Sequence, residues 1–399
     1  MVKSTNFTGQ PIFSQLLRYI SKEDVVRLGK AEGYDRYVKK LDSYTHLVTL
    51  LFAVFERYDS IREIVVGLLS NANKLQHLGV SYCLRRSTFA EANARRSSRL
   101  FGQVYAQLYA RYAHRLADSQ LSKGRMRKLY VMDSTTISLF CAILKGAGRN
   151  PKRGKKKGGI KAHAVIKADE NVPFLVRYTS AATHDHVLLK EVKLPEGSFI
   201  VFDKGYVDYL QYERFSNEGV FYVTKLKANA RYEGLEELDI PDEADSGIIK
   251  DELIVLRKKE LTHTARRIAY WDEEKGKLMV FLTNSMALTA EEVVDIYRRR
   301  WQIESLFKQL KQNFPLKYFY GDSVNAIESQ IWATMIANLL LTLVRGQVRR
   351  AWSFSNLVAM VRQSLMSYID LYRFLEHPEG EWLAVIGSRK KPTPQLRLF

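Results

Sequence analysis

Apolar residues recur at helical spacing through the first 120 residues of the chain. The segments "PIFSQLLRYI", "SKEDVVRL", "LDSYTHLVTLLFAVFERY" and "SIREIVVGLLSNANKL" predict helices, and Ser21 followed by Asp24 has the spacing of an N-cap with an acid at the third helical position. The first part of the chain is therefore predicted to be helical throughout.

From about residue 127 the pattern changes to short alternating or continuous apolar runs. Strands are predicted at "KLYVMDSTTISLF", "GGIKAHAVIKAD", "VPFLVRYTSAA", "SFIVFDKGY" and "VFYVTKL", with helices at "HDHVLLKEV" and "YLQYERFSNEG". A second group of strands is predicted between about 247 and 284, and helices return from 323 to about 375. This order predicts an α/β domain between two helical regions.

The segment "DIYRRRWQIESLFKQLKQNF", residues 295 to 314, has the pattern of a single amphipathic helix. Tyr297, Arg300, Glu304 and Lys311 fall within roughly 60° of one another on the helix wheel, beside an apolar band. Arg and Lys suit phosphate and a carboxylate suits a divalent metal, so the stripe fits an active-site wall. An ordinary surface helix with ion pairs at i,i+4 has the same pattern.

Charge and cysteine content narrow the choice of partner. The 399 residues carry a formal net charge of +19, which favours a polyanion, with nucleic acid ahead of an anionic membrane surface. Cys83 and Cys141 form no CxxC pair, which excludes a zinc finger or a disulfide scaffold and predicts a reducing cytoplasm. The apolar runs "HLVTLLFAVF" and "IWATMIANLLLTLV" are shorter than the roughly 18 residues of a membrane span and predict buried core helices.

Two aspartates directly follow apolar runs in the α/β region. Asp133 comes after "LYVM" and Asp203 after "FIVF", which predicts that both lie at the carboxyl ends of strands, the edge where α/β sheets place ligands. Either one alone has the pattern of a strand-end turn. Together with Glu304, however, they form a set of three carboxylates that can hold two divalent cations at a phosphodiester, and Mg²⁺ suits such a set.

These residues resemble a known family. Asp133 in "VMDST", Asp203 in "VFDKGY" and the spacing Y-x2-R-x3-E-x6-K are similar to the DDE triad and YREK motif of the insertion-sequence-4 family of bacterial transposases. The resemblance covers roughly residues 125 to 345. It implies a ribonuclease H-like catalytic core, a mixed sheet flanked by helices, with a β-rich insertion between the second aspartate and the glutamate.

The resemblance also implies a division of the chain. Residues 1–120 would form a helical domain that binds transposon ends, and "STFAEANARRSSRLFGQ" is its candidate DNA-binding segment. Residues 121–345 would form the catalytic domain, with the insertion at about 230–288. Residues 346–399 would form a helical region with dimer contacts and a basic tail.

The implied chemistry is cut-and-paste DNA transposition. Asp133, Asp203 and Glu304 would hold two Mg²⁺ ions, for which Mn²⁺ substitutes, and an activated water would cut double-stranded DNA at the terminal inverted repeats. The freed 3′-OH would then attack the opposite strand. In relatives this gives a hairpin intermediate, which is opened before the end is joined to target DNA. A homodimer on paired ends is implied. Tyr297, Arg300 and Lys311 would hold phosphates, and Trp271 would stack on an extruded base, although a strand aromatic that packs on the sheet has the same pattern.

Two further stretches carry candidate binding residues. "LKGAGRNPKRGKKKGGIKAH" contains Lys155, Lys156 and Lys157, which predict a sequence-independent DNA-binding loop or an ordinary solvated hairpin loop. "THDHVLLK" contains His184 and His186, but a helix cap explains that stretch better than a metal pair.

Other protein classes share part of this pattern. A ribonuclease H-like nuclease would have the three acids without the YREK spacing or the large insertion. A haloacid-type phosphatase would need an acid at position 135, where the chain has Thr135. A domesticated, non-catalytic DNA-binding protein would be expected to have lost an acid, and none is lost.

Overall fold

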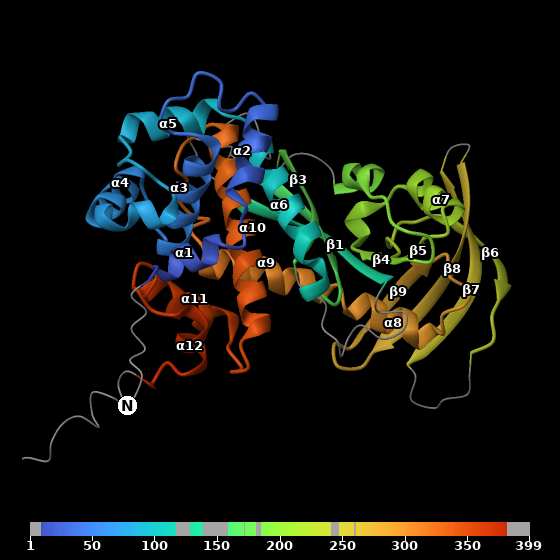
Figure 1. The fold of residues 1–399 in the computed structure, drawn as a ribbon. Coiled ribbons are helices and arrows are strands. Elements are labelled where there is room, and N and C mark those ends of the chain that lie inside the picture. The colour runs from blue at the N-terminus through green and yellow to red at the C-terminus, as the bar shows by residue number, and fades with distance from the viewer. Residues whose placement is uncertain are drawn as a thin grey trace, which may run out of the picture. The chain divides into compact units, whose positions relative to one another are not determined.

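The computed structural model describes residues 9–116, 128–138, 159–170, 172–180, 185–240, 247–258 and 261–380. The chain divides into two compact units, one made of residues 1–115 with 309–399 and the other of residues 116–308 (Figure 1). The predicted basic loop with Lys155, Lys156 and Lys157, and His184 as well, fall outside the described residues.

The first unit is helical. Ser21 accepts a hydrogen bond from the Asp24 backbone N–H at 3.1 Å, which confirms the predicted cap. The described helices of this unit are α1 (Ile12–Leu17), α2 (Lys22–Ala31), α3 (Ser43–Glu56), α4 (Ile61–Ser70), α5 (Arg86–Arg95), α6 (Arg99–Tyr112), α10 (Val324–Gln347), α11 (Phe354–Gln363) and α12 (Leu371–Glu376).

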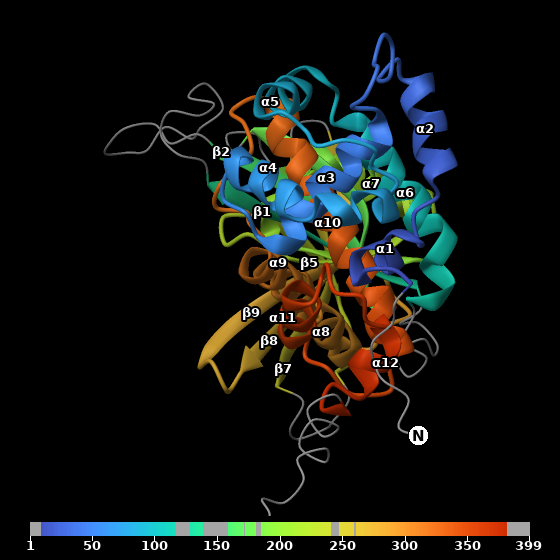
Figure 2. The ribbon, with the colours of Figure 1, turned by 60° about the vertical axis from the view of Figure 1, so that its left-hand side comes forward.

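The long helix α10 forms the core of this unit. It packs against α3, α5, α6 and α11, and Figure 2 shows it running among the N-terminal helices. Its length and composition would suffice to cross a membrane, but 83% of its most apolar window is buried in the protein, so it is a core helix as predicted. Residues 324–345, which the family resemblance grouped with the catalytic domain, belong to this helical unit, where α10 packs against its helices.

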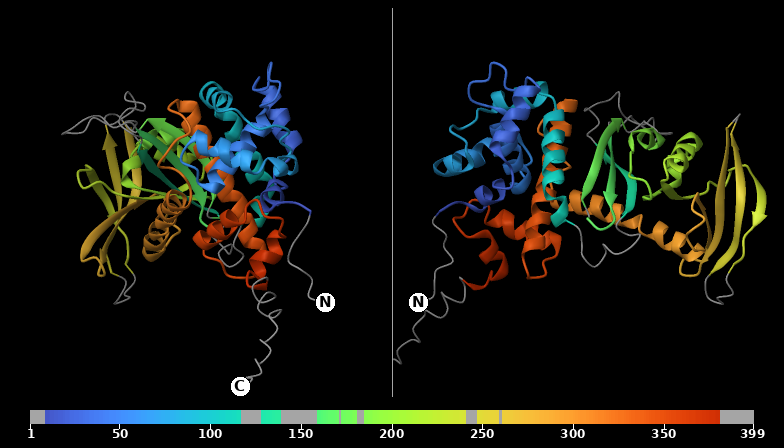
Figure 3. Two further views of the ribbon diagram at one scale, coloured as in Figure 1. Left: turned by 90° about the vertical axis from the view of Figure 1, so that its left-hand side faces the viewer. Right: turned by 45° about the vertical axis from the view of Figure 1, so that its right-hand side comes forward.

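In the second unit the described residues form one nine-stranded mixed sheet with the order β3-β2-β1-β4-β5-β9-β8-β7-β6. The pairs β1/β4 and β4/β5 are parallel and the other pairs are antiparallel; Figure 3 shows the twisted antiparallel part with β6 at its outer edge. The strands are β1 (Leu129–Ser138), β2 (Gly159–Lys167), β3 (Pro173–Ser180), β4 (Phe199–Phe202), β5 (Phe221–Lys225), β6 (Tyr232–Glu237), β7 (Ile248–Lys258), β8 (Leu261–Asp272) and β9 (Lys277–Thr283).

Helices cover both faces of this sheet. Helix α7 (Tyr209–Asn217) packs against β5 and β8, whereas α8 (Ala290–Arg298) packs against β4, β5, β7 and β9. Adjacent residues of a strand point to opposite faces, so Leu282 joins the core cluster that contains α7 while Phe281 contacts Tyr297 of α8, with ring centroids 5.0 Å apart. The position of α8 places its carboxyl end next to β4 and β5.

The structure corrects three local predictions. Residues 295 to 314 are not one helix, because α8 ends at Arg298 and α9 (Trp301–Asn313) begins after a turn held by i→i−3 backbone bonds. Asp133 does not end its strand, because β1 continues to Ser138 through its antiparallel pairing with β2. The predicted helix at "HDHVLLKEV" is a 3₁₀ helix, η5 (Asp185–Glu191).

Candidate active site

The parallel pairing of β1 with β4 brings Asp133 and Asp203 together. The last residues in register are Met132 and Phe202, so the two aspartates follow directly at the same edge of that pairing. Asp203 leaves the sheet into the short helix η6 (Lys204–Tyr206) without capping it through its side chain, and Asp133 continues along β1. The Asp133 carboxylate accepts a hydrogen bond from the backbone N–H of Ser134 at 2.7 Å.

The segment from α8 to α9 supplies the other side chains of the candidate site. Tyr297 donates its hydroxyl proton to Asp203 Oδ1 at 3.3 Å, and Arg300 Nη1 donates to Asp133 Oδ2 at 2.6 Å. Arg300 Nη2 also pairs with Glu304 Oε1 on the next turn. Two residues of the predicted stripe, Tyr297 and Arg300, therefore contact the three predicted carboxylates. The helix break places Arg300 between Asp133 and Glu304.

The carboxylates affect one another electrostatically. Burial raises the pKa of Asp133 to about 6; the Ser134 N–H and Arg300 oppose the rise, while the charges of Asp203 and Glu304 add to it. Burial also raises the pKa of Tyr297, and the neighbouring charge of Asp203 acts in the same direction. The Tyr297 phenol therefore stays protonated at neutral pH and remains a hydrogen-bond donor to Asp203.

The donor set fits a hard divalent cation by its chemistry. Three carboxylates within electrostatic range of one another, one of them with a raised pKa, gain from a positive charge placed among them. Within the described residues, no three His, Cys, Asp or Glu side chains are arranged tightly enough to hold a metal ion. In this structure the guanidinium of Arg300 supplies the positive charge between Asp133 and Glu304.

The structure describes two further predicted DNA-binding residues, Lys311 and Trp271. Lys311 lies on α9 beyond Lys308, the last residue of the second unit, with an exposed side chain. Trp271 lies near the end of β8 with 43% of its surface exposed, and its strand partner is Leu278. That exposure is compatible with stacking on a base.

Sequence reasoning missed a group of lysines beside Asp203. Lys204 follows Asp203 directly, and the Lys225 ammonium lies 4.7 Å from the centre of the Tyr297 ring. Burial lowers the pKa of Lys225, and the charges of Lys277, Arg300 and Lys204 lower it further, whereas Asp203 opposes the shift. The signal in the sequence was the alternation in "YVTKLKA", where Lys225 and Lys227 occupy alternate positions.

Comparison with known proteins defines the class. The family model described as "Transposase DDE domain" matches residues 124–340, more than half of the chain. The chain therefore belongs to the DDE transposase family and is a DNA transposase whose partner is DNA. Residues 8–81 match a second model, described as "Domain of unknown function (DUF4372)".

Three transposases, two of them named for insertion sequence elements, are similar over 61% to 65% of this chain. "Putative transposase y4zB" of Sinorhizobium fredii is 30% identical over 259 residues, covering 63% of this chain and 69% of the relative. "Probable transposase for insertion sequence element IS5377" of Geobacillus stearothermophilus is 25% identical over 61% of this chain and 64% of the relative. "Putative transposase for insertion sequence element IS4SA" of a Synechocystis strain is 23% identical over 65% and 71%.

Among solved structures, the piggyBac transposase synaptic complex with hairpin DNA, determined by cryo-EM, matches with a TM-score of 0.44 and 11% identity. The match covers 96% of this chain and 86% of the other. At that score the likeness adds nothing to the assignment.

Proposed function

We propose that this transposase catalyses cut-and-paste transposition of an insertion sequence of the insertion-sequence-4 family. The observation that carries the proposal is the register of β1 with β4, which puts Asp133 and Asp203 at one edge, joined there by Tyr297 and Arg300. The spacing of Tyr297, Arg300, Glu304 and Lys311 supports the YREK assignment.

The sheet order supports a ribonuclease H-like core. The strands β3, β2, β1, β4 and β5 form a mixed sheet in which β1, β4 and β5 are parallel and β2 lies antiparallel to both neighbours. The antiparallel strands β6 to β9 continue from β5 and correspond to the proposed insertion between Asp203 and Glu304.

Each residue of the site has a proposed role in cutting the phosphodiester. Asp133, Asp203 and Glu304 would hold two Mg²⁺ ions, with Mn²⁺ as a substitute, and the bound ions would supply Lewis-acid activation of the nucleophile and charge neutralisation at phosphate. Tyr297 fixes the orientation of Asp203 through its hydrogen bond. Arg300 neutralises Asp133 and Glu304. Because it lies beside these proposed metal ligands, it would also contact a phosphate that binds at the same site.

The reaction begins with hydrolysis at the end of the element. The oxygen of water bonds to phosphorus, the bond between phosphorus and the 3′ oxygen breaks, and a 3′-OH and a 5′-phosphate result. That 3′-OH is the nucleophile of the later transesterification into target DNA. Lys311, Trp271 and the basic stretch with Lys155, Lys156 and Lys157 are proposed to bind the DNA, and residues 1–120 to recognise the terminal repeats. The protein would act in the bacterial cytoplasm as a homodimer on paired ends.

A cleavage assay tests the proposal. The protein is incubated with a duplex that spans the junctions between its own gene's element and the flanking DNA, and the products are separated on a denaturing gel. Mg²⁺-dependent cuts at the junctions with 3′-OH ends, abolished by a chelator, are expected. Specific binding of the junction without any cut would instead favour a non-catalytic DNA-binding protein.

A further inference from the structure

A hollow of about 380 Å³ opens in the second unit beside Asp203, and its lining is strongly cationic. Twelve residues from η6, β5, β6, β8, β9 and the loop after β5 line it, and none of them is acidic. Its cationic residues are Lys204, Lys225, Lys227, Arg267 and Lys277.

The lysines of this hollow form no ion pair with any carboxylate that the structure describes. Among the described residues, no carboxylate lies within salt-bridge distance of Lys204, Lys225, Lys227 or Lys277; the ion pairs formed on neighbouring strands involve other residues. Arg267 differs, because it pairs with Glu252 at 2.5 Å and lies 5.1 Å from the centre of the Tyr232 ring. Four lysines without an ion pair line this one hollow, and like charges repel, so the hollow favours an anionic occupant.

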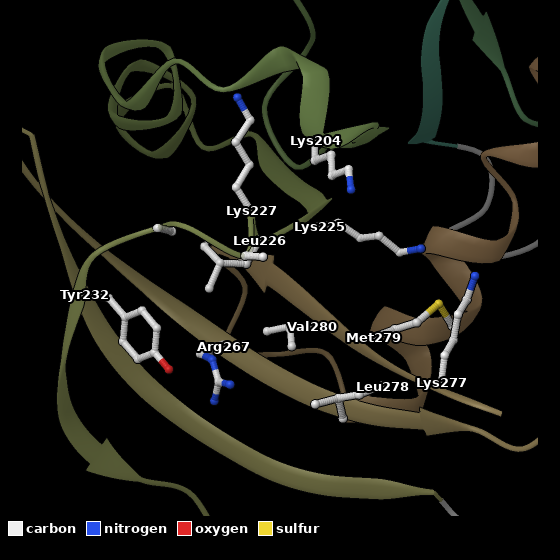
Figure 4. A pocket seen from close by; sticks show the side chains of 12 residues that line it. Lys204, Lys225, Leu226, Lys227, Tyr232, Arg267, Lys277, Leu278, Met279 and Val280 are labelled. Atoms are coloured by element: carbon white, nitrogen blue, oxygen red, sulfur yellow. The ribbon is translucent and has the colours of Figure 1, made fainter. Parts of the chain in front are cut away.

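The positions of the lysines indicate an elongated occupant. Figure 4 shows the amino groups of Lys204, Lys225 and Lys277 turned toward the same side of the hollow, while Lys227 points the other way. The first group adjoins the candidate active site, since Lys204 follows Asp203 and Lys225 contacts the ring of Tyr297. The exposed side chains of Tyr232 and Leu278 add apolar surface to the same lining. Several cations together with apolar surface suit a chain of phosphates joined by sugars.

We infer that this hollow, lined by Lys204, Lys225, Lys227 and Lys277, binds consecutive backbone phosphates of the DNA strand that passes through the active site. The inference rests on the proposed function and adds to it a second set of DNA contacts, on β5, β9 and the loop after β5. Because the contacts are made to phosphates, they fix the path of the strand without reading its sequence.

Salt dependence of binding tests the inference. The probe is a fluorescent duplex that carries one element end with its flanking DNA, bound by the full-length protein. The variant Lys227→Ala/Lys277→Ala is compared with Lys190→Ala/Lys193→Ala, which removes two exposed lysines elsewhere in the same unit. Loss of two phosphate contacts is expected to lower the slope of log affinity against log salt by about two, so that the affinity changes about tenfold less between 50 and 200 mM salt. The control should keep the wild-type slope.

A methylphosphonate scan identifies the phosphates concerned. Each phosphate around the cleavage site is replaced singly by a neutral methylphosphonate. Replacing a phosphate that lies in the hollow should weaken binding by the wild type but should not weaken binding by Lys227→Ala/Lys277→Ala. Phosphates that show this difference support the inference whether they lie in the flanking DNA or inside the element. Their location tells which side of the cleavage site binds in the hollow. Equal losses for both proteins at every position would overturn it.

The outcomes separate this inference from the proposed function. If the wild type cuts its ends but the double variant retains the wild-type salt slope, the hollow is not a DNA site and the transposase assignment stands. If the wild type neither binds nor cuts its ends, both the proposed function and this inference are wrong.

Discussion

Arg300 connects two of the three proposed metal ligands by direct ion pairs. Its guanidinium pairs with Asp133 and Glu304, and its side chain is 16% exposed, as is that of Asp133. In the absence of metal, Arg300 thus compensates two carboxylates that would otherwise repel each other. Its role in charge balance is separate from any contact that it makes with DNA.

Replacing Arg300 with Ala is therefore expected to destabilise the metal-free protein. Two carboxylates lose their counter-charge in a partly buried place, at a cost of about 1–3 kcal/mol in the free energy of unfolding. Saturating Mg²⁺ should recover part of that loss, because the ions supply the missing charge. Urea unfolding with and without Mg²⁺ measures both effects, with Arg299→Ala as the matched control. An equal loss with and without Mg²⁺ would show that Arg300 acts only through packing.

His46 gives the helical unit a measurable pH dependence. It is fully buried, with Nδ1 2.7 Å from the Tyr34 hydroxyl and Nε2 2.8 Å from Asn93 Oδ1, and burial lowers its pKa to about 3. Between about pH 6.5 and pH 3 the unfolded chain binds a proton at His46 that the folded protein excludes. Stability is therefore lost as the pH falls through that range, by up to about 1.4 kcal/mol per pH unit.

The corresponding prediction compares wild type with His46→Gln. From pH 7 to pH 5 the wild type should lose about 2 kcal/mol more unfolding free energy than the variant. Glu56 acts in the opposite direction, since burial raises its pKa to about 7, but its contribution is common to both proteins and cancels. Urea unfolding at the two pH values gives the difference. Parallel pH profiles would mean that His46 is protonated in the folded protein.

Among the secondary-structure elements, a buried ion pair between β7 and β8 also holds the residue that precedes the N-cap of α8. Arg266 on β8 donates to both carboxylate oxygens of Asp251 on β7, at 2.8 and 2.5 Å, and to the carbonyl of Leu288 at 2.5 Å. The Leu288 carbonyl lies immediately before Thr289, the N-cap of α8. One side chain thus joins two strands of the sheet to the helix that presents Tyr297.

Removing one partner of this ion pair should lower the free energy of unfolding more than removing both partners. Arg266→Ala leaves Asp251 charged and buried, so a loss of about 3–5 kcal/mol in unfolding free energy is expected. The double variant Asp251→Ala/Arg266→Ala should be more stable than that single variant. Denaturant unfolding of the three proteins measures the difference. If the double variant were the less stable, the ion pair would not be what holds the start of α8.

The sequence predicted these elements where local pattern determines structure. The strands β1 to β5 and β7 to β9 were found because their apolar runs are bounded by turns, and Asp203 was placed correctly because its strand ends after "FIVF". The break at Arg299 and Arg300 contains no glycine or proline and could not be read locally. Asp133 within β1 and its bond to Arg300, 167 residues away, depend on tertiary pairing that no short window contains.

At the scale of the whole molecule, moving a DNA segment requires both of its ends to be cut and joined. One active site per end implies at least two protomers, and a closed pair would have twofold symmetry. The expected behaviour is a free protein that is mainly monomeric and dimerises on two transposon ends. Light scattering with and without end DNA measures this, and a monomer that persists on saturating end DNA would contradict it.

The dimer is further expected to act in trans, each catalytic site cutting the DNA end bound mainly by the other subunit. A Glu304→Ala subunit is mixed with a subunit whose residues 1–120 carry a defect in end recognition. Each protein alone should be inactive and the mixture should cut. If no end is cut in the mixture, each subunit cleaves the DNA that it binds itself.

Asp203 at the end of β4 and Asp133 in the middle of β1 are proposed to hold the metal ions that cut DNA. The most direct measurement is cleavage of a junction duplex by Asp203→Asn, which keeps the shape of the side chain and an acceptor for Tyr297 while removing the charge. Asp208→Asn, five residues further along the same loop, is the matched control. Asp203→Asn should bind end DNA nearly as tightly as the wild type and produce no cuts on a denaturing gel, while Asp208→Asn cuts normally. Substantial cleavage by Asp203→Asn would show that the Asp203 carboxylate is not part of the catalytic site.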